Sequence, residues 1–119
     1  MFNIEEIRQE SILHSNAYED WSPEATIKEF IWASRSYEKN QTESNFKRHS
    51  IAVKAIYHQF HKYNPDMSDV VISATLSRLN YEDFLVASYP GASLIKRNEE
   101  LRRVEQLFGI KNPISDWFF

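Results

Sequence analysis

Three of the four histidines in this sequence fall within one short segment, and two of them have the spacing of metal ligands. His58 and His61 are three residues apart, which puts two imidazoles on one side of a helix and suits zinc or nickel. The segment from Ser44 to Asn64 has no Asp or Glu to complete such a site, and the sequence has no Cys. We therefore expect no metal site and no cofactor. His49, His58 and His61 are instead expected to be partly exposed and to gain charge below about pH 6.5.

The sequence carries none of the motifs that mark common enzyme sites. Its two glycines, Gly91 and Gly109, stand in separate contexts, which excludes a phosphate-binding loop and a dinucleotide-binding fingerprint. Without Cys there is no thiol nucleophile and no disulfide. Adjacent carboxylates such as Glu99 and Glu100 point about 100° apart on a helix, so they do not pair for acid–base chemistry. We predict a protein without catalytic residues, and keep an enzyme whose site is assembled from distant residues as a third alternative.

Charge is distributed unevenly along the chain. The formal net charge is −3, from 14 basic and 17 acidic residues, so the chain lacks the basic balance of an obligate nucleic-acid binder. Residues 1–43 contain nine acids and four bases, residues 44–64 no acid and four bases, and residues 65–119 eight acids and six bases. If the middle segment is a helix, one side of it carries a set that we call the cationic face: Lys47, Lys54, His58, His61 and Lys62.

The cationic face has two interpretations. It could bind a negatively charged partner, either an acidic protein surface or the phosphates of a nucleic acid, with an affinity that falls as salt is added. Alternatively, the acidic segments before and after it could fold against it and neutralise it within the chain. We expect the first, with an acidic protein surface favoured over a nucleic acid.

Trp32 is the aromatic residue least easily assigned to a core. It lies off the apolar stripe around Phe30, so it either packs on a second layer or contacts a partner, and tryptophan is enriched among the residues that contribute most to interfaces. We include Trp32 as an aromatic anchor of the predicted binding surface. Trp21 is expected to pack at a helix start, and the tail Trp117-Phe118-Phe119 to close one end of the core.

Residues 81–103 allow an alternative function, DNA binding through an element that resembles a helix-turn-helix. Tyr81 to Ser88 would form the first helix, and the turn Tyr89-Pro90-Gly91-Ala92 would lead into a recognition helix. The residues offered to bases and phosphates would be Ser93, Lys96, Arg97 and Asn98. DNA binding is disfavoured by three acidic residues on the same helix, which would face the phosphates: Glu99, Glu100 and Glu105. An ordinary helical hairpin with ion pairs along its second helix explains the same pattern.

Length and composition predict the elements that position these residues. A chain of 119 residues with 42% hydrophobic residues makes one domain, residues 1–119, and the scarcity of glycine argues against the tight turns of a β-fold. We predict an all-α fold, a single compact domain of five to six helices around one core. The predicted helices run from Asn3 to about Ser15, from Ser22-Pro23 to about Tyr37, from about Thr42 to Tyr63, over Ile72 to Leu79, from an Asn80 cap to Ser88, and from Ser93 to Phe108 with Gly109 at the end.

Together these features predict a small, non-enzymatic helical protein that binds a macromolecular partner. Proteins of this kind are often adaptors, inhibitors or immunity-type proteins of bacteria and phages, so a phage or mobile-element origin fits. Acidic Glu5 and Glu6 near the start do not suit a signal peptide, and no run of about 20 apolar residues could span a membrane, so we expect a cytoplasmic protein. A homodimer would explain surplus apolar side chains without a foreign partner.

Overall fold

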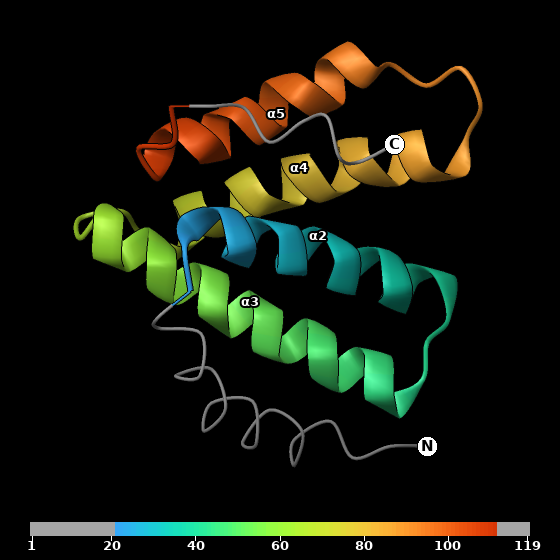
Figure 1. The fold of residues 1–119 in the computed structure, drawn as a ribbon, viewed down its shortest axis with the longest axis horizontal. Coiled ribbons are helices and arrows are strands. Elements are labelled where there is room, and N and C mark those ends of the chain that lie inside the picture. The colour runs from blue at the N-terminus through green and yellow to red at the C-terminus, as the bar shows by residue number, and fades with distance from the viewer. Residues whose placement is uncertain (1–20, 112–119) are drawn as a thin grey trace. The chain divides into compact units, whose positions relative to one another are not determined.

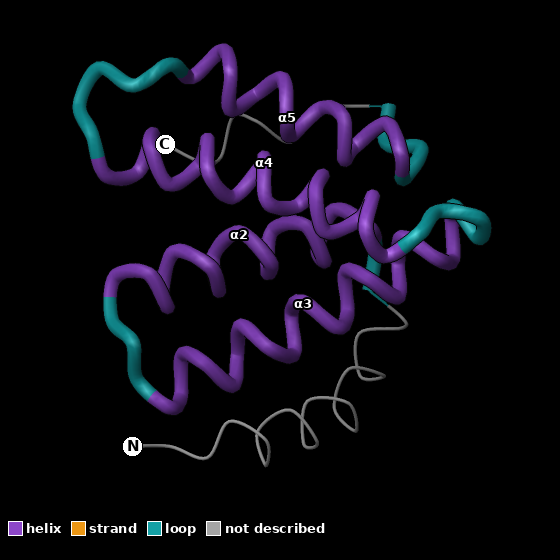
Figure 2. The backbone as a smooth tube through the Cα atoms, turned by 180° about the vertical axis from the view of Figure 1, so that it is seen from behind, coloured by secondary structure: helices purple, strands orange, loops and turns teal. Residues whose placement is uncertain are grey.

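The computed structural model describes residues 21–111, and the regular elements in this part of the chain are all helices. They are α2 (Pro23–Lys39), α3 (Glu43–Tyr63), α4 (Asp69–Ser88) and α5 (Leu94–Leu107), drawn in Figures 1 and 2. The predicted all-α class is confirmed for these residues. The helix expected from Asn3 to Ser15 and the tail Trp117-Phe118-Phe119 lie outside the described residues.

Backbone contacts divide the chain into two units, Met1–Gln59 and Phe60–Phe119. The first unit contains α2 and most of α3, and the second contains the end of α3 together with α4 and α5. The single domain over residues 1–119 stays a prediction.

The helices of the first unit begin where the sequence predicts. The Ser22 hydroxyl accepts a hydrogen bond from the backbone N–H of Ala25 at 3.1 Å, and Pro23 occupies the first helical position, where its missing N–H costs nothing. Thr42 caps α3 in the same way, because its hydroxyl accepts from the N–H of Asn45 at 3.1 Å. The two helices lie side by side and run in opposite directions, joined by a short loop (Figures 1 and 2).

The buried side of α2 is the predicted apolar stripe. Tyr37 meets Phe46 of α3 with ring centroids 5.5 Å apart, and the Gln59 amide donates to the backbone carbonyl of Trp21 at 3.1 Å. These contacts join α2 to α3 at both ends of the two helices. The buried apolar side chains of the two helices are Ile27, Phe30, Ile31, Ala33, Ala52, Ala55, Ile56 and Phe60.

Two buried hydroxyl groups form their hydrogen bonds within their own helix. The Ser34 hydroxyl donates to the Phe30 carbonyl at 2.8 Å, and the Thr75 hydroxyl donates to the Val71 carbonyl at 2.8 Å. Each acceptor lies four residues earlier, so neither hydroxyl needs a group from another helix.

α4 is one continuous helix of 20 residues, and the expectation that Asn80 caps a new helix is wrong. Leu79 and Asp83, on either side of Asn80, are both buried on the same face. A cap contributes about 1 kcal/mol, whereas burying one leucine side chain contributes about 2 kcal/mol, so continuing the helix is favoured over restarting it. Residues 21–111 therefore contain four helices, while the sequence analysis predicts five to six for the whole chain.

α4 and α5 pack against each other as an antiparallel hairpin within the second unit (Figures 1 and 2). Gly91 in the turn and Gly109 after α5 have φ of 84° and 69°, the left-handed conformation that glycine adopts without strain. The sequence predicts Gly91 in a turn and Gly109 at the end of a helix, and both predictions are confirmed. Phe60 and Phe108 lie with ring centroids 4.7 Å apart, so the end of α3 packs near the end of α5.

Arg97 is the most deeply buried charged residue of the hairpin, with a relative exposure of 0%. Its guanidinium Nη1 donates to the Asp83 carboxylate at 3.4 Å, and its Nε donates to the Asn98 side-chain oxygen at 2.9 Å. The Asp83 side chain is also buried. This ion pair joins α4 to α5 across 14 residues of sequence.

Replacing Asp83 with alanine is expected to lower the free energy of unfolding by about 3 kcal/mol, because Arg97 would keep a buried charge without its Asp83 partner. Urea unfolding followed by circular dichroism measures the change. The control is Glu99→Ala at an exposed position of α5, which should change stability by no more than about 0.5 kcal/mol. Equal losses in the two variants would contradict a structural role for the pair.

Candidate binding surfaces

The cationic face lies along one continuous helix, α3. Lys54, His58, His61 and Lys62 are exposed and Lys47 is half-buried. Their spacing keeps all five within about one third of the helix circumference. The Lys62 ammonium lies 5.9 Å from the centroid of the neighbouring Tyr63 ring, which is itself exposed. The side chains that bury α3, including Ala52, Ile56 and Phe60, point to the other side.

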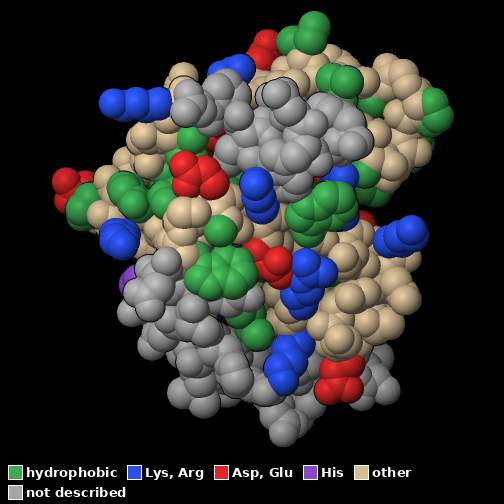
Figure 3. Space-filling view, in the orientation of Figure 1, with side chains coloured by type: hydrophobic (Ala, Val, Ile, Leu, Met, Phe, Trp, Pro, Cys, Tyr) green, Lys and Arg blue, Asp and Glu red, His purple; other side chains and the backbone are tan. Residues whose placement is uncertain are grey.

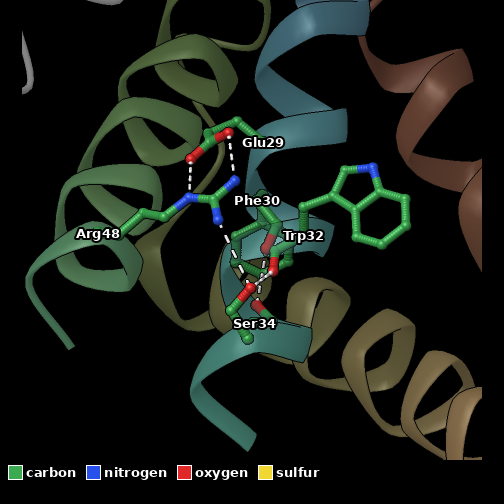
Figure 4. A network of polar contacts seen from close by, with 6 residues as sticks. Glu29, Phe30, Trp32, Ser34 and Arg48 are labelled. Atoms are coloured by element: carbon green, nitrogen blue, oxygen red, sulfur yellow. Dashed lines mark hydrogen bonds and ion pairs between the residues drawn. The ribbon is translucent and has the colours of Figure 1, made fainter. Parts of the chain in front are cut away.

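Arg48 and His61 of α3 are paired with carboxylates of this chain. Arg48 donates twice to Glu29 of α2, at 2.6 and 3.0 Å, as Figure 4 shows. His61 lies 2.8 Å from the Asp69 carboxylate at the start of α4. Among residues 21–111, no ion pair joins a carboxylate to Lys54 or Lys62. Internal neutralisation therefore reaches part of α3 and leaves exposed lysines on the cationic face.

His49 differs from the other histidines of α3. It is partly exposed, as expected, but the expectation that it readily gains charge is wrong. Its ring stacks on Tyr37 of α2 at 5.8 Å and lies 6.4 Å from the Phe30 ring. Burial lowers the pKa of His49, and nearby Glu38 opposes that shift. His49 packs α3 against α2 as a neutral ring and adds nothing to the cationic face near neutral pH.

Trp32 is exposed over 41% of its surface, on the outer side of α2. Figure 4 shows its indole pointing away from Arg48 and α3, whereas Phe30, two residues earlier, is buried. The guanidinium of Arg35 lies 5.1 Å from the centroid of the indole ring, within the range of a cation–π interaction. Trp32 therefore lies on a side of α2 that is turned away from Arg48 of α3.

Three basic residues surround Trp32 on α2, and the sequence analysis did not identify them as a group. Relative to Trp32, Lys28 lies four residues earlier, Arg35 three residues later and Lys39 seven residues later. At this spacing all four residues share one side of the helix. We call these four residues the Trp32 face. Counting charges over residues 1–43 hid this cluster among nine acids, whereas helical spacing would have found it. Figure 3 shows Lys and Arg side chains, with some Asp and Glu, interleaved with hydrophobic ones over the face of the molecule where Figure 1 places α2.

The residues proposed for DNA reading lie around the start of α5 and are only partly accessible. Ser93 caps the helix, with its hydroxyl accepting from the N–H of Lys96 at 3.3 Å, and Lys96 is exposed. Arg97 is buried against Asp83, and Asn98 is half-buried and accepts from Arg97. The structure thus offers Lys96 to a phosphate but keeps the guanidinium of Arg97 inside the hairpin.

Other chemistry is not apparent in the described part of the chain. Residues 21–111 contain no group of three or more His, Cys, Asp or Glu side chains placed to hold a metal ion. None of the described helices is long and apolar enough to cross a membrane. The absence of a cofactor and of catalytic residues stays a prediction.

Comparison of the chain with protein-family models, with curated proteins and with solved structures gave no match.

Stability is expected to fall as the pH drops below about 6.5, because the unfolded chain, in which His49 has its ordinary pKa, takes up a proton more readily than the folded one. Urea unfolding at pH values from about 7 down to 5 measures the slope. The variant His49→Gln should reduce this slope, whereas Gln106→Ala, which removes no titrating group from an exposed position of α5, should leave it unchanged. A slope that His49→Gln does not alter would contradict the assignment.

Trp32→Ala is expected to lower the free energy of unfolding by less than about 1 kcal/mol, the range of an exposed cation–π contact. The matched control is Phe30→Ala in the same helix, which removes a buried ring and should cost about 3 to 5 kcal/mol. Both are measured by urea unfolding. A loss for Trp32→Ala as large as that for Phe30→Ala would assign Trp32 to the core and remove it as an anchor.

Proposed function

We propose that this protein binds an acidic protein partner through the cationic face of α3. The observation that carries the proposal is the exposure of Lys54, His58 and Lys62 on a stretch of helix without carboxylates, from Ser44 to its end at Tyr63. Arg48 and His49 are turned toward α2, so the exposed lysines are the part of the helix that is available to a partner.

The spacing of the exposed lysines suits a partner with regularly placed carboxylates. Lys54 and Lys62 are eight residues apart, which corresponds to about 12 Å along the helix axis. Carboxylates two turns apart on a helix of the partner would match this distance. Charge pairs of this kind increase the rate of association and weaken with added salt.

An acidic protein is favoured over a nucleic acid by the charge of the whole chain. The net charge is −3, so phosphates that approach Lys54 and Lys62 would also be repelled by the acids of the remaining chain. A protein partner presents a local acidic patch and avoids most of that repulsion. DNA binding through residues 81–103, and an enzyme of unknown chemistry, remain the alternatives.

The Trp32 face is proposed as a second contact region of this chain. An indole beside Lys28, Arg35 and Lys39 combines a large apolar surface with positive charge, a combination that is common where proteins bind each other. The biological role proposed is that of a cytoplasmic adaptor, inhibitor or immunity-type protein, of phage or mobile-element origin. A homodimer is also proposed.

Fluorescence anisotropy with two labelled probes, poly-L-glutamate and a random-sequence DNA duplex, tests the proposal. Wild-type protein is expected to bind poly-L-glutamate more tightly than the duplex at low salt, with an affinity that falls as salt is added. The double variant Lys54→Glu, Lys62→Glu should bind poly-L-glutamate about tenfold more weakly, a change of about 1.4 kcal/mol.

The matched control reverses two exposed charges on α5, Lys96→Glu and Arg102→Glu, and should leave poly-L-glutamate binding unchanged. Tighter binding to the duplex, lost in the α5 variant and kept in the α3 variant, would replace the proposal with DNA binding. Failure of the wild-type protein to bind poly-L-glutamate at low salt would overturn it.

A further inference from the structure

α4 has a second apolar face, which points to solvent. Val70, Tyr81 and Phe84 are exposed over 78%, 61% and 37% of their surfaces, and the small residues between them are exposed as well. The positions are spaced by four and three residues in alternation, the spacing of the contact positions in a coiled coil. We call this set the α4 seam: Val70, Ala74, Ser77, Tyr81, Phe84 and Ser88.

The α4 seam lies opposite the side of α4 that is already packed. Ile72, Leu76 and Leu79 are buried on the other side, together with Asp83, which binds Arg97 of α5. A helix with apolar residues on two opposite sides is normally covered on both. Here one side is covered and the α4 seam is exposed along the full length of the helix.

No charged residue belongs to the α4 seam, although α4 contains four. Asp69, Glu82 and Asp83 lie on other sides, and Arg78, beside the seam, is 3.7 Å from Glu100 of α5. An uncharged surface offers nothing to an acidic or a basic partner. It can, however, meet an identical surface without repulsion between like charges, which is the requirement of a two-fold symmetric interface.

The order of small and large residues along the α4 seam matches an antiparallel copy of itself. The six positions are symmetric about Leu79, so two antiparallel helices pair Ser77 with Tyr81 and Ala74 with Phe84 of the second copy. Each aromatic ring then faces a small side chain, and Val70 faces Ser88. A parallel pair would crowd the rings at one end and leave gaps at the other, both of which destabilise packing.

From this placement we infer that the α4 seam is the interface of a homodimer in which α4 packs antiparallel to α4 of a second copy of this chain. The inference does not depend on the cationic face of α3, because it uses a different helix and uncharged residues. Tyr89, which lies edge-on to Phe84 at 6.1 Å and is exposed, extends the apolar surface at one end of the α4 seam.

Sedimentation equilibrium of the full chain tests the interface. The wild-type protein is expected to be dimeric at micromolar concentrations, and Ser77→Glu should weaken the dimer at least about 100-fold, because two buried carboxylates would enter each interface. Gln106→Glu adds the same charge at an exposed position of α5 and should leave the dimer intact. Circular dichroism should show the same helix content in all three proteins, since both positions are exposed in the single chain.

The orientation is tested with one spin label, because the sequence has no cysteine and Ala87→Cys provides a single thiol beside the α4 seam. In the antiparallel dimer the two labelled backbone positions lie about 24 Å apart along the helix axes, whereas a parallel dimer holds them about 10 Å apart. A monomeric wild type, a dimer that Ser77→Glu does not weaken, or the shorter distance would each overturn the inference.

Discussion

The burial of a guanidinium decides much of how the second unit is arranged. Arg97 reaches no solvent, so its charge must be balanced by a carboxylate held in place, and Asp83 supplies it from α4. This pair fixes which side of α4 faces α5. Because Asp83 shares that side with Ile72 and Leu79, the opposite side is the one left exposed, and it is the side that carries the α4 seam.

Much of the local structure could be predicted from the sequence because its signals act over a few residues. Ser22-Pro23 begins α2, and Gly109 ends α5 with a left-handed backbone, as the pattern indicated. Asn80 shows where such signals fail. Its capping preference is local and small, whereas Asp83, three residues later, is buried against Arg97 of α5, which follows later in the chain. Sequence patterns do not reveal which of two competing effects is larger.

The candidate surfaces were predicted less completely, because they too depend on contacts between helices that are distant in the sequence. The residues of the cationic face share one side of α3 because helical spacing alone decides that. Which cations are neutralised depends on contacts between helices, and neither the Arg48–Glu29 pair nor the ring stack of His49 on Tyr37 has a signature in the sequence. The Trp32 face was within reach of sequence reasoning, but counting charges by segment averaged its three cations with nine acids.

The buried polar groups of this chain differ in how freely they can be replaced in the course of evolution. Ser34 and Thr75 bond to carbonyls of their own helix, so each can be exchanged for alanine while the residues facing it stay as they are. Asp83 and Arg97 have no such independence, since each helps to balance the buried charge of the other. Substitution is therefore constrained pairwise at positions 83 and 97, which join α4 to α5, and singly at positions 34 and 75.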